Sequence, residues 1–239
     1  MPSATGLSIP ASFLRFRERF GDEPFSVSDA AQVLRARPYL ELSRLARLGW
    51  LFRIGRGRYA TVDPLVRLTA GVETNLRPFR SKCFYPILYR SAGEILRLYS
   101  GRLRAIALFG SCARGTSGPE SDLDLLVLLT ERPISVYEDA RERGRLDGSA
   151  APLLVDEFDR TKHYHRAQVL VATEEDFARP APVLFDLPQE ARILYDPDGS
   201  LRSALRRLSR LLREKGARRI ARAGEAPYWK LGTILEAAA

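Results

Sequence analysis

One stretch near the centre of the chain decides the fold: LFGSCARGTSGPESDLDLLV, residues 108–127. The apolar run at its start predicts a buried strand that ends at Gly110, and residues 123–129 (LDLLVLL) predict a second buried strand. Asp122 and Asp124 lie where the second strand begins. Side chains two residues apart on a strand point the same way, with Cα atoms about 6.5–7 Å apart. The stretch therefore predicts an acidic pair opposite a glycine turn.

An acidic pair of this kind suits divalent cations. Two cations about 3.5–4 Å apart can activate an attacking hydroxyl and stabilise a leaving pyrophosphate. Carboxylate oxygens together with substrate phosphates complete the octahedral shell that Mg²⁺ prefers. We therefore expect Asp122 and Asp124 to be metal ligands, with two Mg²⁺ ions as cofactor.

The glycine turn has the composition of a phosphate-binding segment. Gly110 lets the backbone approach a triphosphate without a Cβ, and backbone N–H groups with the Ser111 hydroxyl can cradle phosphate oxygens. Arg114 can add charge-assisted contacts, and Gly115 permits a sharp turn behind it. Ser111 lacks the glycine two residues later that a nucleophile elbow requires, and no Lys-Ser/Thr follows as in a Walker loop.

These residues strongly resemble the DNA polymerase beta-like nucleotidyltransferase superfamily, particularly its minimal prokaryotic members. The resemblance rests on Gly110-Ser111, Ala113-Arg114-Gly115 and Ser121-Asp122-Leu123-Asp124, and it covers roughly residues 82–196. It implies a small mixed sheet flanked by helices, and it adds Ser121 to the nucleotide-binding residues. It also implies a nucleoside triphosphate substrate, Mg²⁺, and transfer of a nucleoside monophosphate to a hydroxyl.

The chain departs from the family pattern at a third carboxylate. The family presents this acid from a neighbouring strand, which we align with residues 168–173 (QVLVAT), so that Gln168 takes its place. Glutamine cannot act as a base or balance cationic charge. Asp156, in LLVDEF, is the alternative, and we take it as the third catalytic residue.

The first part of the chain resembles the winged-helix domains of small prokaryotic regulators and antitoxins, over roughly residues 10–65. Helices are expected at 13–20, 27–36 and 39–50, before a hairpin around Gly55-Arg56-Gly57. A helix in the major groove and a wing on the phosphates would bind nucleic acid. The candidate residues are Arg44 and Arg47 on the helix, and Arg53, Arg56 and Arg58 on the wing. A solvated basic face or a protein-contact surface is the alternative.

The expected fold class is α/β (α+β), in four segments. They are a winged helix-turn-helix at 1–65, a connector at 66–81, a nucleotidyltransferase domain at 82–196 and a basic helical extension at 197–239. Within them, we expect helices at 82–99, 135–146 and 200–215 and a strand at 191–195.

Composition and charge narrow the class of protein. With 239 residues, 45% of them hydrophobic, the chain can bury a substantial core, and no apolar run or basic leader predicts a membrane span or signal peptide. We expect a cytoplasmic protein with no membrane partner.

The net charge is +6 over residues 1–80, −3 over 81–196 and +6 over 197–239. Basic ends around an acidic middle favour a polyanionic partner, with an RNA end such as that of tRNA, or a protein hydroxyl, as the acceptor.

The histidines form one small group, in which His163 and His165 flank Tyr164. Two alternate histidines can ligate zinc, but the sequence offers no complete ligand set, and a structural or acceptor-side role is favoured. Cys112, beside the glycine turn, is expected to be a small buried thiol.

Two functions remain. The first is a Mg²⁺-dependent nucleotidyltransferase with a nucleic-acid-binding or partner-binding N-terminal domain. The second is a DNA-binding regulator or toxin–antitoxin-type protein whose transferase fold senses nucleotide or is inactive. The uncertain third carboxylate favours the second, and the acidic pair favours the first.

Overall fold

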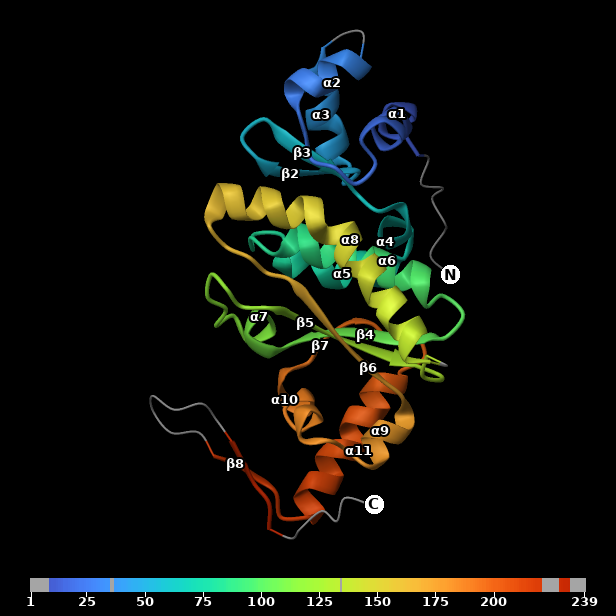
Figure 1. The fold of residues 1–239 in the computed structure, drawn as a ribbon, viewed down its shortest axis with the longest axis vertical. Helices are drawn as coiled ribbons and strands as arrows, with labels where there is room; N and C mark the ends of the chain where they lie inside the picture. The colour runs from blue at the N-terminus through green and yellow to red at the C-terminus, as the bar shows by residue number, and fades with distance from the viewer. Residues whose placement is uncertain (1–8, 35–36, 134, 221–227, 233–239) are drawn as a thin grey trace.

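The computed structural model describes residues 9–34, 37–133, 135–220 and 228–232. Its elements stack in layers (Figure 1): an N-terminal unit, a layer of helices, a β-sheet and a further group of helices beyond the sheet. This is a mixed α/β architecture, as the sequence predicts. No helix of the described residues has the length and apolar character needed to cross a membrane.

The N-terminal unit contains three helices and a small antiparallel sheet. Its elements are α1 (Ala11–Phe20), β1 (Phe25–Ser26), α2 (Val27–Val33), α3 (Pro38–Arg47), β2 (Leu51–Gly55) and β3 (Arg58–Thr61), with strand order β1-β3-β2. The helix α2 begins with a reciprocal capping box formed by Ser26 and Asp29. On α3, Leu42 and Leu45 are buried, whereas Leu40 is exposed.

The layer of helices differs from two predictions, one for the segment 66–81 and one for the length of the helix expected at 135–146. The segment 66–81, expected to be a connector, is helical: α4 (Pro64–Leu68), α5 (Ala70–Leu76) and the 3₁₀ turn η1 (Arg77–Phe79) lie beside α6 (Tyr85–Leu98). Val66, Val72 and Leu76 belong to the same core cluster as α6. The helix expected at 135–146 is α8 (Val136–Thr161), which continues through Pro152.

The central sheet has the order β6-β5-β4-β7. Its strands are β4 (Leu103–Phe109), β5 (Leu123–Leu129), β6 (Ala167–Ala172) and β7 (Arg192–Tyr195). β5 pairs with β4 antiparallel and with β6 parallel, and β7 pairs antiparallel with β4. The sheet is therefore mixed, in agreement with the family resemblance.

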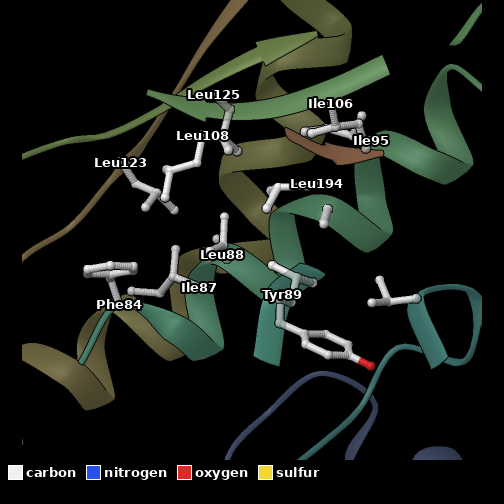
Figure 2. Close-up of a cluster of buried hydrophobic side chains, with 14 of the residues drawn as sticks. Phe84, Ile87, Leu88, Tyr89, Ile95, Ile106, Leu108, Leu123, Leu125 and Leu194 are labelled. Atoms are coloured by element: carbon white, nitrogen blue, oxygen red, sulfur yellow. The ribbon is translucent and has the colours of Figure 1, made fainter. Parts of the chain in front are cut away.

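The two faces of the sheet bury different cores. Leu123 and Leu125 of β5 point toward α6, whose Ile87 and Leu88 point back toward them (Figure 2). Leu126 and Leu128 belong to the other core, with residues of α9 and α11. Because side chains alternate along a strand, the odd-numbered residues Leu123 and Leu125 lie on one face of the sheet. The even-numbered residues Leu126 and Leu128 lie on the other face.

The second core is closed by the C-terminal elements. They are α9 (Glu174–Ala178), the 3₁₀ turn η2 (Pro182–Leu184), α10 (Leu187–Glu190), α11 (Ser200–Glu214), β8 (Arg218–Ile220) and β9 (Tyr228–Lys230). Leu201, Leu208 and Leu212 of α11 are buried. The helix expected at 200–215 is α11, and among the described residues of the basic extension β8 and β9 follow it as an antiparallel ribbon.

The N-terminal unit is joined to the layer of helices by shared packing and ion pairs. Phe52 of β2 makes edge contacts with Tyr85 and Tyr89 of α6. Arg90 of α6, which is 2% exposed, pairs with Asp22 and donates to the Thr61 carbonyl at 3.1 Å. The unit is thus attached to the rest of the chain through a common core.

The correction at residues 66–81 predicts different responses of two leucines. Leu76→Ala removes a fully buried side chain of the core and should lower the free energy of unfolding by about 2–5 kcal/mol. Leu68→Ala, at a position 53% exposed in the same segment, should change it by less than about 0.5 kcal/mol. Urea unfolding followed by circular dichroism measures both, and equal effects would contradict the assignment of this segment to the core.

Candidate functional site

The acidic pair lies at the start of β5, on the face opposite α6 and α8. Leu123 and Leu125 point into the core beneath α6 and α8, so Asp122 and Asp124, which alternate with them, belong to the other face. Asp124 pairs across the sheet with Phe109, the last residue of β4. The pairing brings the end of β4, and the turn after it, next to the two aspartates.

Gly110 begins that turn and lies directly against Asp124. Its φ of +69° is in the left-handed region, and a Cβ at this position would overlap the Asp124 carboxylate. The short helix α7 (Gly110–Arg114) follows and ends at Gly115, whose φ is +78°. A glycine is therefore required at 110 by both backbone conformation and space.

The electrostatics of the pair favour a bound cation. Burial, and secondly the charge of Asp122, raise the pKa of Asp124, and Glu190 adds to the effect while Arg114 opposes it. Within the part of the chain that the structure describes, no hydrogen bond or ion pair holds either aspartate carboxylate. Two adjacent carboxylates without such a partner repel one another, and hard oxygen ligands of this kind fit Mg²⁺.

A third acid beside this site is Glu190, which the sequence analysis did not identify. It lies on α10, is 8% exposed, and pairs with Arg114 on one side and with Arg219 of β8 at 2.6 Å on the other. Arg114, expected to contact phosphate, thus forms an ion pair with a carboxylate. No local pattern indicates Glu190, because only the folded chain brings α10 next to α7.

The remaining residues of the loop shape its backbone. The Gly118 N–H donates to the Ser121 hydroxyl at 2.8 Å, and the Ser121 N–H donates to the Gly118 carbonyl at 3.2 Å. The Cys112 thiol, buried as predicted, donates to the Asp122 carbonyl at 3.4 Å. Ser111 lies at the start of α7, where its carbonyl accepts from the Thr116 N–H at 3.0 Å. Nucleotide contacts of Ser111 and Ser121 stay predictions.

Asp156 does not join the site, which corrects the prediction of a third catalytic acid. It lies on α8, and α8 packs on the face of the sheet opposite the aspartate pair. Its carboxylate pairs with Arg58 of β3 at 2.5 Å. The position in register with Asp124 on β6 is Gln168, which is exposed. The neighbouring strand thus places a neutral amide where the family resemblance implies an acid.

The five arginines expected to bind nucleic acid all lie on the surface of the N-terminal unit. Arg44 is held by Glu41 of the same helix, with N···O distances of 2.8 and 2.9 Å. Arg58 forms an ion pair with Asp156. Arg47, Arg53 and Arg56 are exposed and have no ion-pair partner among the described residues.

A family comparison identifies the central domain. Residues 89–180 match the family described as "Nucleotidyltransferase domain". The match includes the whole of β4, α7 and β5, and with them Gly110, Asp122 and Asp124. The chain therefore contains a nucleotidyltransferase domain. No curated protein matches the chain.

Comparison with solved structures gives weaker likenesses. A structure described as a toxin–antitoxin with AMP-PNP has a TM-score of 0.33 and 18% identity, over 53% of this chain and 90% of that chain. Two variants of the toxin–antitoxin MntA-HpeT have TM-scores of 0.34 and 0.31 and 19% identity, over 52% of this chain and 88% and 87% of theirs. TM-scores below 0.5 do not establish a common function, so the family match alone identifies the domain.

The raised pKa of Asp124 predicts a stabilising substitution. A carboxyl group whose pKa rises on folding above its ordinary value of 3.8 binds more protons in the folded chain, so stability is lost as pH rises through the folded pKa. Asp124→Asn removes the ionisable carboxyl group, and with it this loss of stability as pH rises. Calorimetry in EDTA should therefore give the variant a higher Tm than the wild type at pH 7, with a difference that shrinks toward pH 3.8. Equal Tm values at pH 7 would contradict the account of this carboxylate.

Proposed function

We propose that the chain is a Mg²⁺-dependent nucleotidyltransferase that moves NMP from a nucleoside triphosphate to a hydroxyl of a macromolecular acceptor. The observation that supports this most is the pair Asp122 and Asp124, which share one sheet face against the Gly110 turn inside the matched domain. The basic segments at both ends favour RNA, such as the end of a tRNA, and a protein hydroxyl is the alternative acceptor.

Each residue of the site has a part in this reaction. Asp122 and Asp124 hold the cations, and the turn at Gly110 and Ser111 receives the triphosphate. Bound Mg²⁺ supplies the charge that activates the hydroxyl and stabilises the leaving pyrophosphate. Arg114 exchanges Glu190 for a phosphate, and Glu190 keeps Arg219 as its counter-charge.

The reaction balances without a further reactant. The acceptor oxygen forms a bond to the α-phosphorus, the bond from that phosphorus to the bridging oxygen breaks, and pyrophosphate leaves. The hydroxyl proton has to pass to water or to the acceptor itself, because Gln168 is a neutral amide and cannot accept it. We therefore expect slow transfer by the isolated chain.

Label transfer tests the proposal. Each of the four α-³²P nucleoside triphosphates is incubated with the chain, Mg²⁺ and either total RNA or total protein. Asp122→Asn and Asp124→Asn should each lower transfer by about 100-fold or more, because charge stabilisation at the phosphorus is lost. Asp156→Asn is the matched control and should retain transfer, because α8 lies on the other face of the sheet.

A gain of function sharpens this test. Gln168→Asp places a carboxylate in register with Asp124 and should raise the transfer rate, whereas Gln168→Asn should not. The proposal is wrong if no nucleotide is transferred to either acceptor class by the wild type or by Gln168→Asp. Unchanged transfer in the Asp122 and Asp124 variants would also contradict it.

The N-terminal unit supports a winged-helix assignment and nucleic-acid binding. Its order of helices and strands, α1-β1-α2-α3-β2-β3, and its three-stranded antiparallel sheet support the proposal that it is a winged helix. Arg47 on α3 and Arg53 and Arg56 on the hairpin are exposed, as phosphate contacts require. Arg58 is removed from this set because it pairs with Asp156.

Fluorescence anisotropy with duplex DNA at several salt concentrations tests this assignment. Arg47→Ala with Arg56→Ala should weaken binding and lower the slope of log K against log salt by about 2. Arg104→Ala with Arg132→Ala removes the same charge from the central sheet region, where these side chains pair with Asp198 and Asp176, and should leave that slope unchanged. Binding that is equally weakened in both double variants would refute a specific role for the N-terminal unit.

The second candidate function is a DNA-binding regulator with a catalytically inactive transferase fold. The observation that favours it is Gln168, which leaves the site one carboxylate short. It predicts that Asp122→Asn with Asp124→Asn preserves DNA binding, and that the wild type binds nucleotide without transferring it.

A further inference from the structure

A second cluster of reactive side chains lies on the α6 and α8 side of the sheet, away from the acidic pair. It brings together Cys83, His163 and His165, whose potential ligand atoms all lie within 4.8 Å of one another. The chain has two histidines and two cysteines, so both histidines and one of the cysteines are in this cluster. The sequence analysis missed the ligand set because Cys83 lies 80 residues before His163.

The distances in the cluster suit a tetrahedral metal. The Cys83 Sγ atom is 3.4 Å from His163 Nδ1 and 4.0 Å from His165 Nδ1. Zinc bonds of about 2.3 Å to sulfur and 2.0–2.1 Å to nitrogen place S and N ligand atoms about 3.5 Å apart in a tetrahedron. Small side-chain rotations are therefore enough to bind an ion.

Glu157 lies against His165, just outside the group of three residues whose ligand atoms are all within 4.8 Å of one another, and it is the candidate for a fourth ligand. It is 3% exposed, its Oε1 lies 2.9 Å from His165 Nδ1, and its Oε2 accepts from the His165 N–H at 3.3 Å. In the described chain no lysine or arginine pairs with this carboxylate, and its only ion-pair partner is His165. A buried carboxylate whose only ion-pair partner is an imidazole is stabilised further by a second cation, which is a reason for a metal that is independent of the ligand distances.

The cluster contains more side chains with ligand atoms than a hydrogen-bonded core histidine needs. A hydrogen-bonded histidine and carboxylate are common in protein cores, but this does not explain the thiol and the second imidazole beside them.

We propose that Cys83, His163, His165 and Glu157 form a structural site for Zn²⁺. One thiolate, two imidazoles and one carboxylate are the ligand types of zinc, whereas Mg²⁺ requires oxygen ligands. The site is thus chemically distinct from the acidic pair on the other face of the sheet. When zinc binds, the Cys83 thiol gives its proton to solvent and both imidazoles are neutral.

The site would connect three segments that lie far apart in the sequence. Cys83 precedes α6, Glu157 lies on α8, and the histidines lie between α8 and β6. The segment with the histidines holds the loop before β5, because the Tyr164 N–H donates to the Pro119 carbonyl at 2.7 Å and the Leu123 N–H to the Arg166 carbonyl at 2.8 Å. A metal here therefore fixes the backbone on which Asp122 and Asp124 lie.

Metal analysis of the full chain, purified without a histidine tag, tests the proposal. After incubation with Zn²⁺ and removal of excess, mass spectrometry should find about one zinc per chain. Cys83→Ser and His163→Ala should lose it. Cys112→Ser is the matched control, because it removes the chain's other thiol and should keep the zinc.

Cobalt substitution gives a readout that does not depend on a variant. The wild-type chain is stripped of metal by a chelator and loaded with Co²⁺. It should then show thiolate charge-transfer absorption and tetrahedral d–d absorption. Cys112→Ser should retain both features, and Cys83→Ser should lose the thiolate band. Stripping should also lower the Tm, and Zn²⁺ should restore it. If Cys83→Ser does not fold, the wild-type spectrum and zinc content decide. A folded wild type that binds no zinc, or binds Co²⁺ without a thiolate band, would overturn the proposal.

Discussion

The backbone of Gly110 lies so close to the Asp124 carboxylate that no side chain fits between them. This contact joins the end of β4 to the start of β5, and it depends on the antiparallel pairing of Phe109 with Asp124. The apolar residues that alternate with the aspartates bury one face of β5 against α6 and direct the acids to the other face. The core and the site are thus two consequences of one strand register.

The charges around the two aspartates lower the stability of the folded chain and favour binding of a cation. Burial and like charge raise the pKa of Asp124, and neither aspartate has an ion pair among the described residues. Arg114, the nearest cation to influence Asp124, is bound instead by Glu190. An unfavourable arrangement of this kind persists where a ligand offsets its cost, and a cation with a triphosphate is the ligand that fits these groups.

The sequence could predict the features that depend on residues close to one another in the chain. Gly110, Asp122 and Asp124 lie within fifteen residues, so strand periodicity alone indicates their common edge. The helix expected at 135–146 continues through Pro152 to Thr161, because α8 packs on α6, and this places Asp156 on the face of the sheet away from the aspartate pair. Glu190 and Cys83 could not be found, because each reaches its neighbours only through tertiary contacts between distant segments.

Crystals grown with Mn²⁺ and a non-hydrolysable nucleoside triphosphate offer the most direct measurement of the role of the acidic pair. Anomalous scattering at the manganese edge locates the ion independently of the protein atoms. We expect manganese between the carboxylates of Asp122 and Asp124, with the triphosphate along the turn at Gly110. A well-ordered nucleotide with no manganese at these two carboxylates would contradict the assignment of the site.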